Sequence, residues 1–102
     1  MNQDRDMMTV VAIAEAKSGD ADKLQDAFFS IIPKVRQEPG CLSYQLHIDQ
    51  TSQHRFVFIE KWENLQALEK HSQTDYFKHM LEQIEPWLVS PMVVHQLHSI
   101  EP

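Results

Sequence analysis

Alternating and continuous apolar runs predict four β-strands along this chain. The short, β-branched run at residues 9–16 is typical of a largely buried strand. Residues 41–48 alternate between apolar and polar side chains, and residues 55–62 are apolar on both faces as far as position 60. A polar connection of about hairpin length, residues 49–54, joins these two strands. The alternating pattern of residues 92–100 predicts the last strand.

Between the strands, apolar residues recur three and four positions apart, which predicts helices. Asp20 suits the N-cap of the first helix, and Pro33 inside the apolar pattern predicts a kink or an early last turn. Asn64 and Thr74 suit the N-caps of two short helices or of one broken helix. The core-facing stripe of the first helix is expected to comprise Leu24, Ala27, Phe28, Ile31, Ile32 and Val35.

The resulting order, β-α-β-β-α-β, predicts an α+β fold of the ferredoxin-like, split βαβ type. In this fold the helices cover one face of an antiparallel sheet. The third strand has Val57 and Ile59 on the side opposite Phe56 and Phe58, so an uncovered sheet face would present apolar side chains to water. We therefore expect a homodimer that forms through the sheet face.

Length and composition exclude several classes of protein. A chain of 102 residues predicts one domain, here residues 8–102, after a polar and disordered N-terminal tail at residues 1–7. Nine basic against fifteen acidic residues give a net charge of −6, which argues against nucleic acid as a partner. No apolar run reaches the roughly 18 residues of a membrane span. The single cysteine, Cys41, permits no intramolecular disulfide, which favours a cytoplasmic location.

Glu60 is the strongest candidate for a functional residue, because the two-residue period of a strand places it in an aromatic row between Phe58 and Trp62. A low-dielectric environment favours a neutral carboxyl group, which can exchange a proton near neutral pH. The alternative is a strand-end glutamate that points to solvent or pairs with a cation. Trp62 could be a core or interface residue, or its indole N–H could donate to a buried ligand.

His71 falls at the end of the first short helix, where the helix dipole favours a protonated imidazole. A surface histidine is the alternative. Tyr76 is near enough in sequence to share a pocket with His71 and to offer its phenol as a donor, although such tyrosines often simply pack. The six histidines show no spacing typical of zinc ligands, so no metal site is expected.

Three motifs occur in order: Glu-Pro-Gly-Cys at residues 38–41, Glu-x-Trp at residues 60–62 and His-x-x-Thr-x-x-Phe at residues 71–77. From the first strand to about Leu88, the chain resembles the antibiotic biosynthesis monooxygenase (ABM) family, most closely its quinol monooxygenase-like members. The resemblance implies a dimeric α+β barrel with a cavity between helices and sheet in each subunit. It also implies oxygenation of a small quinol or electron-rich aromatic by molecular oxygen, without flavin, haem or metal.

By position, this resemblance makes Glu60, His71 and Tyr76 the expected catalytic residues, with Glu60 or His71 as the base and Tyr76 as a hydrogen-bond donor. Tyr76 stands where a second histidine is frequent in the family. The expected substrate-binding residues are Trp62, Tyr44, Phe58, Phe28 and Phe77.

Other activities found in the family are weighed against this one. Haem-degrading members have an asparagine on the first strand and a tryptophan where this chain has His71, and this chain has neither. Residues 82–86 and 90–91 look similar to members that isomerise a phosphorylated signal sugar, a substrate that requires a Lys or Arg in the cavity. A non-catalytic dimer that binds a small hydrophobic ligand or a partner protein is the third alternative.

Overall fold

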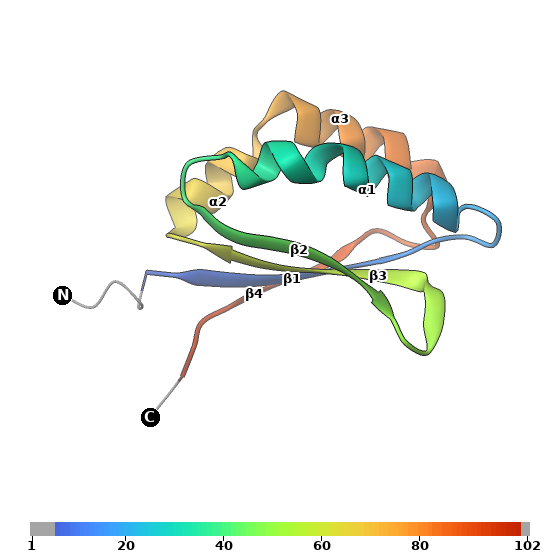
Figure 1. Cartoon of the computed structure of the whole chain (residues 1–102), viewed down its shortest axis with the longest axis horizontal. Coiled ribbons are helices and arrows are strands. Elements are labelled where there is room, and N and C mark those ends of the chain that lie inside the picture. The colour runs from blue at the N-terminus through green and yellow to red at the C-terminus, as the bar shows by residue number, and fades with distance from the viewer. Residues whose placement is uncertain (1–5, 101–102) are drawn as a thin grey trace.

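All four strands pair antiparallel in one sheet, in the order β2-β3-β1-β4, and helices cover one of its faces (Figure 1). The computed structural model describes residues 6–100, so the tail predicted at residues 1–7 lies mainly outside the described part. The elements are β1 Met8–Glu15, α1 Ala21–Arg36, β2 Cys41–Asp49, β3 Ser52–Trp62, α2 Leu65–Ser72, α3 Asp75–Ile84, the 3-10 turn η2 Glu85–Trp87 and β4 Val93–Leu97.

This topology confirms the predicted α+β, ferredoxin-like fold. The second helical segment is two helices, α2 and α3, rather than one broken helix. The last strand is shorter than predicted, and the β2–β3 connection is tighter, because β3 begins at Ser52. The sheet of the single chain is open, with β2 and β4 at its edges.

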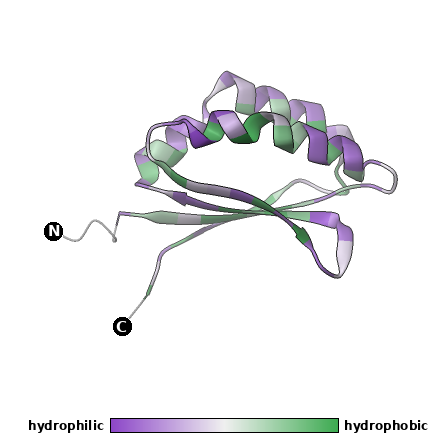
Figure 2. Ribbon diagram, in the orientation of Figure 1, coloured by the Kyte–Doolittle hydropathy of each residue, from purple (hydrophilic) through white to green (hydrophobic). Residues whose placement is uncertain are grey.

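The two-residue period of the strands decides which side chains face the helices. On β3, Phe56, Phe58, Glu60 and Trp62 are all buried, as the sequence predicts. Cross-strand pairing places Glu60 beside Val10 of β1 and Tyr44 of β2. Figure 2 shows hydrophobic residues where helices and sheet face each other and hydrophilic residues at the β2–β3 hairpin.

The helix termini differ in part from the sequence predictions. Asn64 caps α2, because its Oδ1 accepts a hydrogen bond from the Ala67 N–H at 2.9 Å. Asp20 and Thr74 occupy N-cap positions, but neither side chain makes the predicted capping bond. The Thr74 hydroxyl instead donates to the His71 carbonyl at 2.9 Å and so links α2 to α3. Helix α1 continues past Pro33 to Arg36, which leaves the proline in its last turn.

The sheet face opposite the helices carries exposed apolar side chains, and no element within residues 6–100 covers it. Ile59, Val93 and Leu97 are 39%, 49% and 44% exposed on this face. Because Ile13 pairs with Val57 on one side and with Val93 on the other, the apolar surface is continuous across β3, β1 and β4. Within residues 6–100, no helix is long and apolar enough to cross a membrane.

Gly40 allows the α1–β2 loop to lie against α2. Its φ of +85° lies in the left-handed region, and a Cβ added to it would stand 2.5 Å from the Cβ of Ala67. Gly19 has a similar φ of +86°, but an added Cβ would meet nothing within 4 Å. Both glycines therefore have a backbone conformation that other residues rarely adopt, and only Gly40 also lacks space for a side chain.

We predict that Gly40→Ala destabilises the protein more than Gly19→Ala does. The left-handed conformation costs an alanine about 1–2 kcal/mol at either position, and overpacking against Ala67 adds about 1–3 kcal/mol at Gly40 alone. Urea unfolding of both variants measures the difference. Equal loss of unfolding free energy in the two variants would contradict the close approach of Gly40 to α2.

Candidate active site

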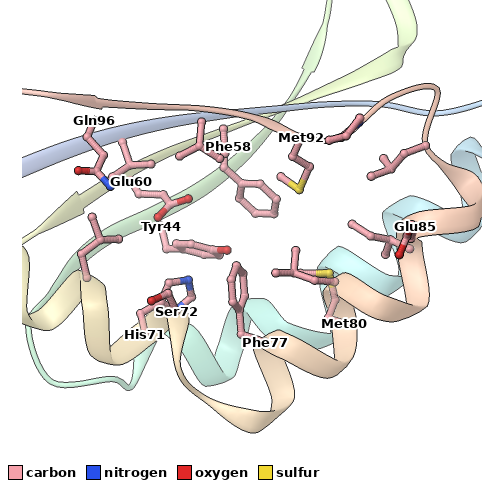
Figure 3. A pocket seen from close by; sticks show the side chains of 18 of the residues that line it. Tyr44, Phe58, Glu60, His71, Ser72, Phe77, Met80, Glu85, Met92 and Gln96 are labelled. Atoms are coloured by element: carbon pink, nitrogen blue, oxygen red, sulfur yellow. The ribbon is translucent and has the colours of Figure 1, made fainter.

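A cavity of about 1000 Å³ lies between the helix-facing side of the sheet and helices α2 and α3 (Figure 3). Strands β1–β4 and the segment 88–92, which leads into β4, also contribute to its walls. Apolar side chains form most of the lining, among them Phe58, Leu68, Phe77, Met80, Ile84 and Met92. The cavity is of the size and polarity that small-molecule sites have.

Glu60 lies in this cavity wall with only 5% of its surface exposed. Its Oε1 accepts a hydrogen bond from the Trp62 indole N–H at 2.9 Å. Burial raises the pKa of the Glu60 carboxyl to about 7; the indole donor opposes this rise, and the nearby Glu38 adds to it. The prediction of a carboxyl in an apolar row is confirmed, and the alternative of a solvent-facing glutamate is wrong.

Trp62 is fully buried and does not line the cavity. It stands behind Glu60 and supplies that residue's hydrogen-bond donor. The expectation that Trp62 contacts a substrate is therefore replaced by a role in holding Glu60.

His71 lines the cavity from the last turn of α2 and is only 3% exposed. Its ring packs among those of Trp62, Phe77 and Tyr44, at centroid distances of 4.7, 4.3 and 5.8 Å. Burial lowers the pKa of His71 and outweighs the opposing effect of the Glu38 carboxylate. The alternative of a surface position is therefore wrong, and so is the prediction of a dipole-stabilised protonated imidazole, because desolvation favours the neutral ring.

Glu38, in the loop after α1, connects two of the predicted residues. Its carboxylate oxygens lie 3.2 and 3.1 Å from His71 Nδ1, and the Tyr76 hydroxyl donates to its Oε2. Tyr76 itself does not line the cavity, so its phenol is not free for a substrate as expected. Sequence reasoning noticed Glu38 in the Glu-Pro-Gly-Cys motif but missed this role, because the contact joins residues 33 positions apart.

Tyr44 supplies the phenol that the cavity does contain. Its side chain is 2% exposed, its ring lies 4.9 Å from that of Phe58, and its hydroxyl points into the open centre of the cavity (Figure 3). Burial, with a further contribution from the neighbouring Glu60, raises the pKa of the Tyr44 hydroxyl far above its ordinary value. The phenol therefore stays protonated and is available as a hydrogen-bond donor.

Three polar atoms remain free to meet a ligand. Among residues 6–100, every fully buried side-chain nitrogen or oxygen has a hydrogen-bond partner. Within the same residues, the Tyr44 hydroxyl, His71 Nε2 and Glu60 Oε2 have no such partner, so each must reach open space. The cavity is the space that all three residues line. A molecule inside it meets a carboxyl, an imidazole nitrogen and a phenol among apolar walls.

The remaining expected residues divide between cavity and core. Phe58 and Phe77 line the cavity, and their contact with a substrate stays a prediction. Phe28 is fully buried against Phe58, with ring centroids 4.9 Å apart, and does not reach the cavity. Met80, Met92 and Gln96 also line the cavity, from α3 and the β4 region, and were not predicted from the sequence. For Gln96 the signal is its pairing with Val10, which places both residues on the helix-facing side of the sheet.

No three histidine, cysteine, aspartate or glutamate side chains converge as metal ligands in the part of the chain that the structure describes.

An open ferredoxin-like sheet, with helices on one face and a largely apolar cavity between helices and sheet, defines the chain as a small α+β domain. Residues 7–83 match the family model described as antibiotic biosynthesis monooxygenase (ABM). The chain belongs to the ABM family, which confirms the resemblance seen in its motifs.

Individual relatives agree with this assignment. The chain is 32% identical over 89 residues to the protein named probable quinol monooxygenase YgiN of Escherichia coli strain K12, covering 78% of this chain and 86% of that protein. It is 40% identical over 62 residues to an uncharacterized protein of Synechocystis sp., sll1783; this match covers 61% of the chain but spans 42% of that protein. The crystal structure of PA3566 from Pseudomonas aeruginosa superposes with a TM-score of 0.87 at 31% identity, covering 94% of this chain and 96% of that one.

We predict that Glu60→Gln flattens the pH dependence of stability. A carboxyl whose pKa rises from 4.5 to about 7 on folding binds more protons in the folded state, so wild-type stability falls as pH increases through this window. At about 1.4 kcal/mol per pH unit, the loss amounts to about 3 kcal/mol between pH 4.5 and pH 8. Glutamine keeps an oxygen for the Trp62 indole N–H but does not titrate.

Urea unfolding across this pH range measures the effect, with Glu82→Gln on the exposed surface of α3 as the matched control. The Glu60→Gln curve should gain stability relative to wild type as pH rises. Parallel curves for wild type and Glu60→Gln would show that Glu60 does not titrate in this window.

Proposed function

We propose that this protein is a cofactor-independent monooxygenase that acts on a small quinol or another electron-rich aromatic. The observation that carries the proposal is the set of three free polar atoms, on Tyr44, His71 and Glu60, in an otherwise apolar cavity. ABM membership and the similarity to probable quinol monooxygenase YgiN support it. The apolar walls suit an aromatic ring, and the polar atoms suit its hydroxyl groups.

The chemistry begins with removal of a phenolic proton. His71 Nε2 or the Glu60 carboxylate accepts it: burial lowers the pKa of His71 and so favours a neutral ring with a free lone pair, and burial raises the pKa of Glu60 to about 7. Tyr44, rather than the expected Tyr76, donates a hydrogen bond to a substrate oxygen, since Tyr76 is bonded to Glu38. The protein binds, orients and deprotonates the substrate, which supplies the electrons.

The redox balance needs only the substrate and molecular oxygen. The phenolate transfers one electron to O₂, and the resulting radical pair combines to form a ring carbon–oxygen bond. Cleavage of the O–O bond then leaves one oxygen atom on the ring and releases the other as water. For a hydroquinone, the products are a hydroxyquinone and one water molecule. Exclusion of bulk water by the apolar lining favours recombination over escape of superoxide.

The isomerase alternative is less well supported. A phosphorylated sugar needs a cationic or strongly donating partner in the cavity. None of the residues that line the cavity in the described part of the chain is Lys or Arg, whereas Glu60, Glu69 and Glu85 are among them. This charge distribution opposes a phosphate dianion and favours a neutral phenol.

We also propose that two copies of the chain associate through the uncovered sheet face to form the dimeric α+β barrel. The apolar surface of Ile59, Val93 and Leu97 supports this, because it is continuous and exposed in the single chain. A cytoplasmic location stays a prediction, based on the single cysteine, Cys41.

Oxygen consumption with a panel of hydroquinones tests the proposed activity. We expect turnover above the autoxidation rate of the buffer, and a loss of about 10²- to 10⁴-fold in a double variant that combines His71→Ala with Glu60→Gln. His79→Ala, an exposed histidine of α3, is the matched control and should keep the wild-type rate. Binding of the quinols without product would indicate a non-catalytic ligand-binding protein and overturn the proposal.

Light scattering at micromolar concentration tests the dimer. The wild-type protein should have twice the mass of the chain, and Ile59→Glu on the sheet face should reduce it to the monomer by placing a charge in an apolar interface. Phe29→Glu, at a 53% exposed position of α1, should remain dimeric. A monomeric wild-type protein would contradict the sheet-face interface.

A further inference from the structure

We propose that Glu38 is a positioning residue: with Tyr76, it holds His71 as the Nδ1–H tautomer and so presents an unprotonated Nε2 to the cavity. The kinetic consequence of this arrangement rests on the proposed oxygenase function. The tautomer itself does not, because it is a property of the resting protein.

The geometry leaves the Nδ1 proton one acceptor. Both Glu38 carboxylate oxygens lie near His71 Nδ1, at 3.2 and 3.1 Å, and the pair is shielded, with 4% and 13% of the His71 and Glu38 side chains exposed. An ionised carboxylate only accepts hydrogen bonds, so the neutral imidazole must carry its proton on Nδ1. The lone pair is then on Nε2, which lacks a partner among residues 6–100 and reaches the cavity.

Tyr76 and Gly40 keep the Glu38 carboxylate in place. The Tyr76 hydroxyl donates to Glu38 Oε2, so the carboxylate is held from the side of α3 as well as by the imidazole. Gly40, two residues after Glu38, brings the loop against Ala67, one helical turn before His71 on α2. The loop after α1 and the two helices α2 and α3 therefore meet at one carboxylate, which is the pattern expected of an orienting group.

The other titratable groups around His71 do not compete for Nδ1. Tyr44 of β2 stays protonated and faces the cavity, and the Glu60 carboxyl of β3 is bonded to the Trp62 indole N–H. The Lys34 ammonium of α1 lies over the Tyr76 ring, 5.5 Å from its centre. Glu38 is also the group whose charge opposes the burial-driven fall in the His71 pKa. Its removal must therefore change both the tautomer and the titration of the ring.

Nitrogen NMR of the full chain, labelled with ¹⁵N-histidine, tests the tautomer directly at a pH where His71 is neutral. We expect a pyrrole-type Nδ1 and a pyridine-type Nε2 for His71, assigned by loss of its signals in His71→Gln. In Glu38→Gln, the Tyr76 hydroxyl occupies the amide oxygen and the amide N–H₂ can face Nδ1, so the populations should shift toward the Nε2–H form. The matched control, Glu82→Gln on the exposed surface of α3, should keep the wild-type spectrum.

A wild-type His71 in the Nε2–H form, or a Glu38→Gln spectrum identical to wild type, would overturn the proposal. If Glu38→Gln does not fold, Tyr76→Phe provides the second test. It removes one hydrogen bond to the carboxylate without touching the imidazole, and the Nδ1–H population should fall. An unchanged population in Tyr76→Phe would remove Tyr76 from the proposal.

A kinetic experiment distinguishes the positioning role of Glu38 from the proposed oxygenase activity. With a hydroquinone that wild type turns over, Glu38→Gln should lower kcat at least about tenfold with little change in KM. The acidic limb of its pH profile should also move to lower pH, because the charge that raises the His71 pKa is gone. An unshifted limb with a lowered kcat would indicate a merely structural residue. An Nδ1–H tautomer in a protein that consumes no oxygen would contradict the oxygenase and leave the orienting role in place.

Discussion

The burial of Glu60 is the constraint on which the site depends. The two-residue period of β3 places this carboxyl on the helix-facing side of the sheet, because Phe58 and Trp62 on the same side are buried in the core. A buried carboxyl must find hydrogen-bond donors or become protonated, and the Trp62 indole supplies one donor. The remaining oxygen has no hydrogen-bond partner among residues 6–100. Glu60 lines the cavity between the sheet and α2–α3, where this oxygen can meet a ligand.

Glu38, in the loop after α1, is the second polar group on which the site depends. Glu38 affects two titratable groups of the cavity wall: it raises the pKa of Glu60 and opposes the fall in the pKa of His71. Its position depends on the close packing of Gly40 against Ala67 and on the division of the second helical segment at Thr74, which turns Tyr76 toward the loop. The conformation of the backbone at Gly40 and Thr74 thus influences the pKa values of Glu60 and His71 through the position of Glu38.

The sequence predicted what depends on local periodicity. The order of strands and helices along the chain, the helix-facing row of β3 and the buried state of Glu60 all follow from the periodicity of apolar residues. The burial of His71 did not, because a helix C-terminus says nothing about the three aromatic rings that other elements pack around it. For the same reason the hydrogen-bond donor was expected to be Tyr76, whereas the phenol that lines the cavity belongs to Tyr44, which was expected only as a substrate-binding residue. Which of the two phenols is free depends on Glu38, a partner from a distant loop that no spacing rule brings to α3.

The central claim is that an apolar environment places a titrating carboxyl in the cavity at neutral pH. Carbon-13 NMR of the side-chain carboxyl groups as a function of pH tests it most directly, with the Glu60 signal assigned by its absence in Glu60→Gln. The account predicts that the Glu60 signal titrates with a midpoint near 7. A midpoint near the ordinary value of 4.5 would mean that the carboxyl is solvated in the folded protein, and would contradict the account.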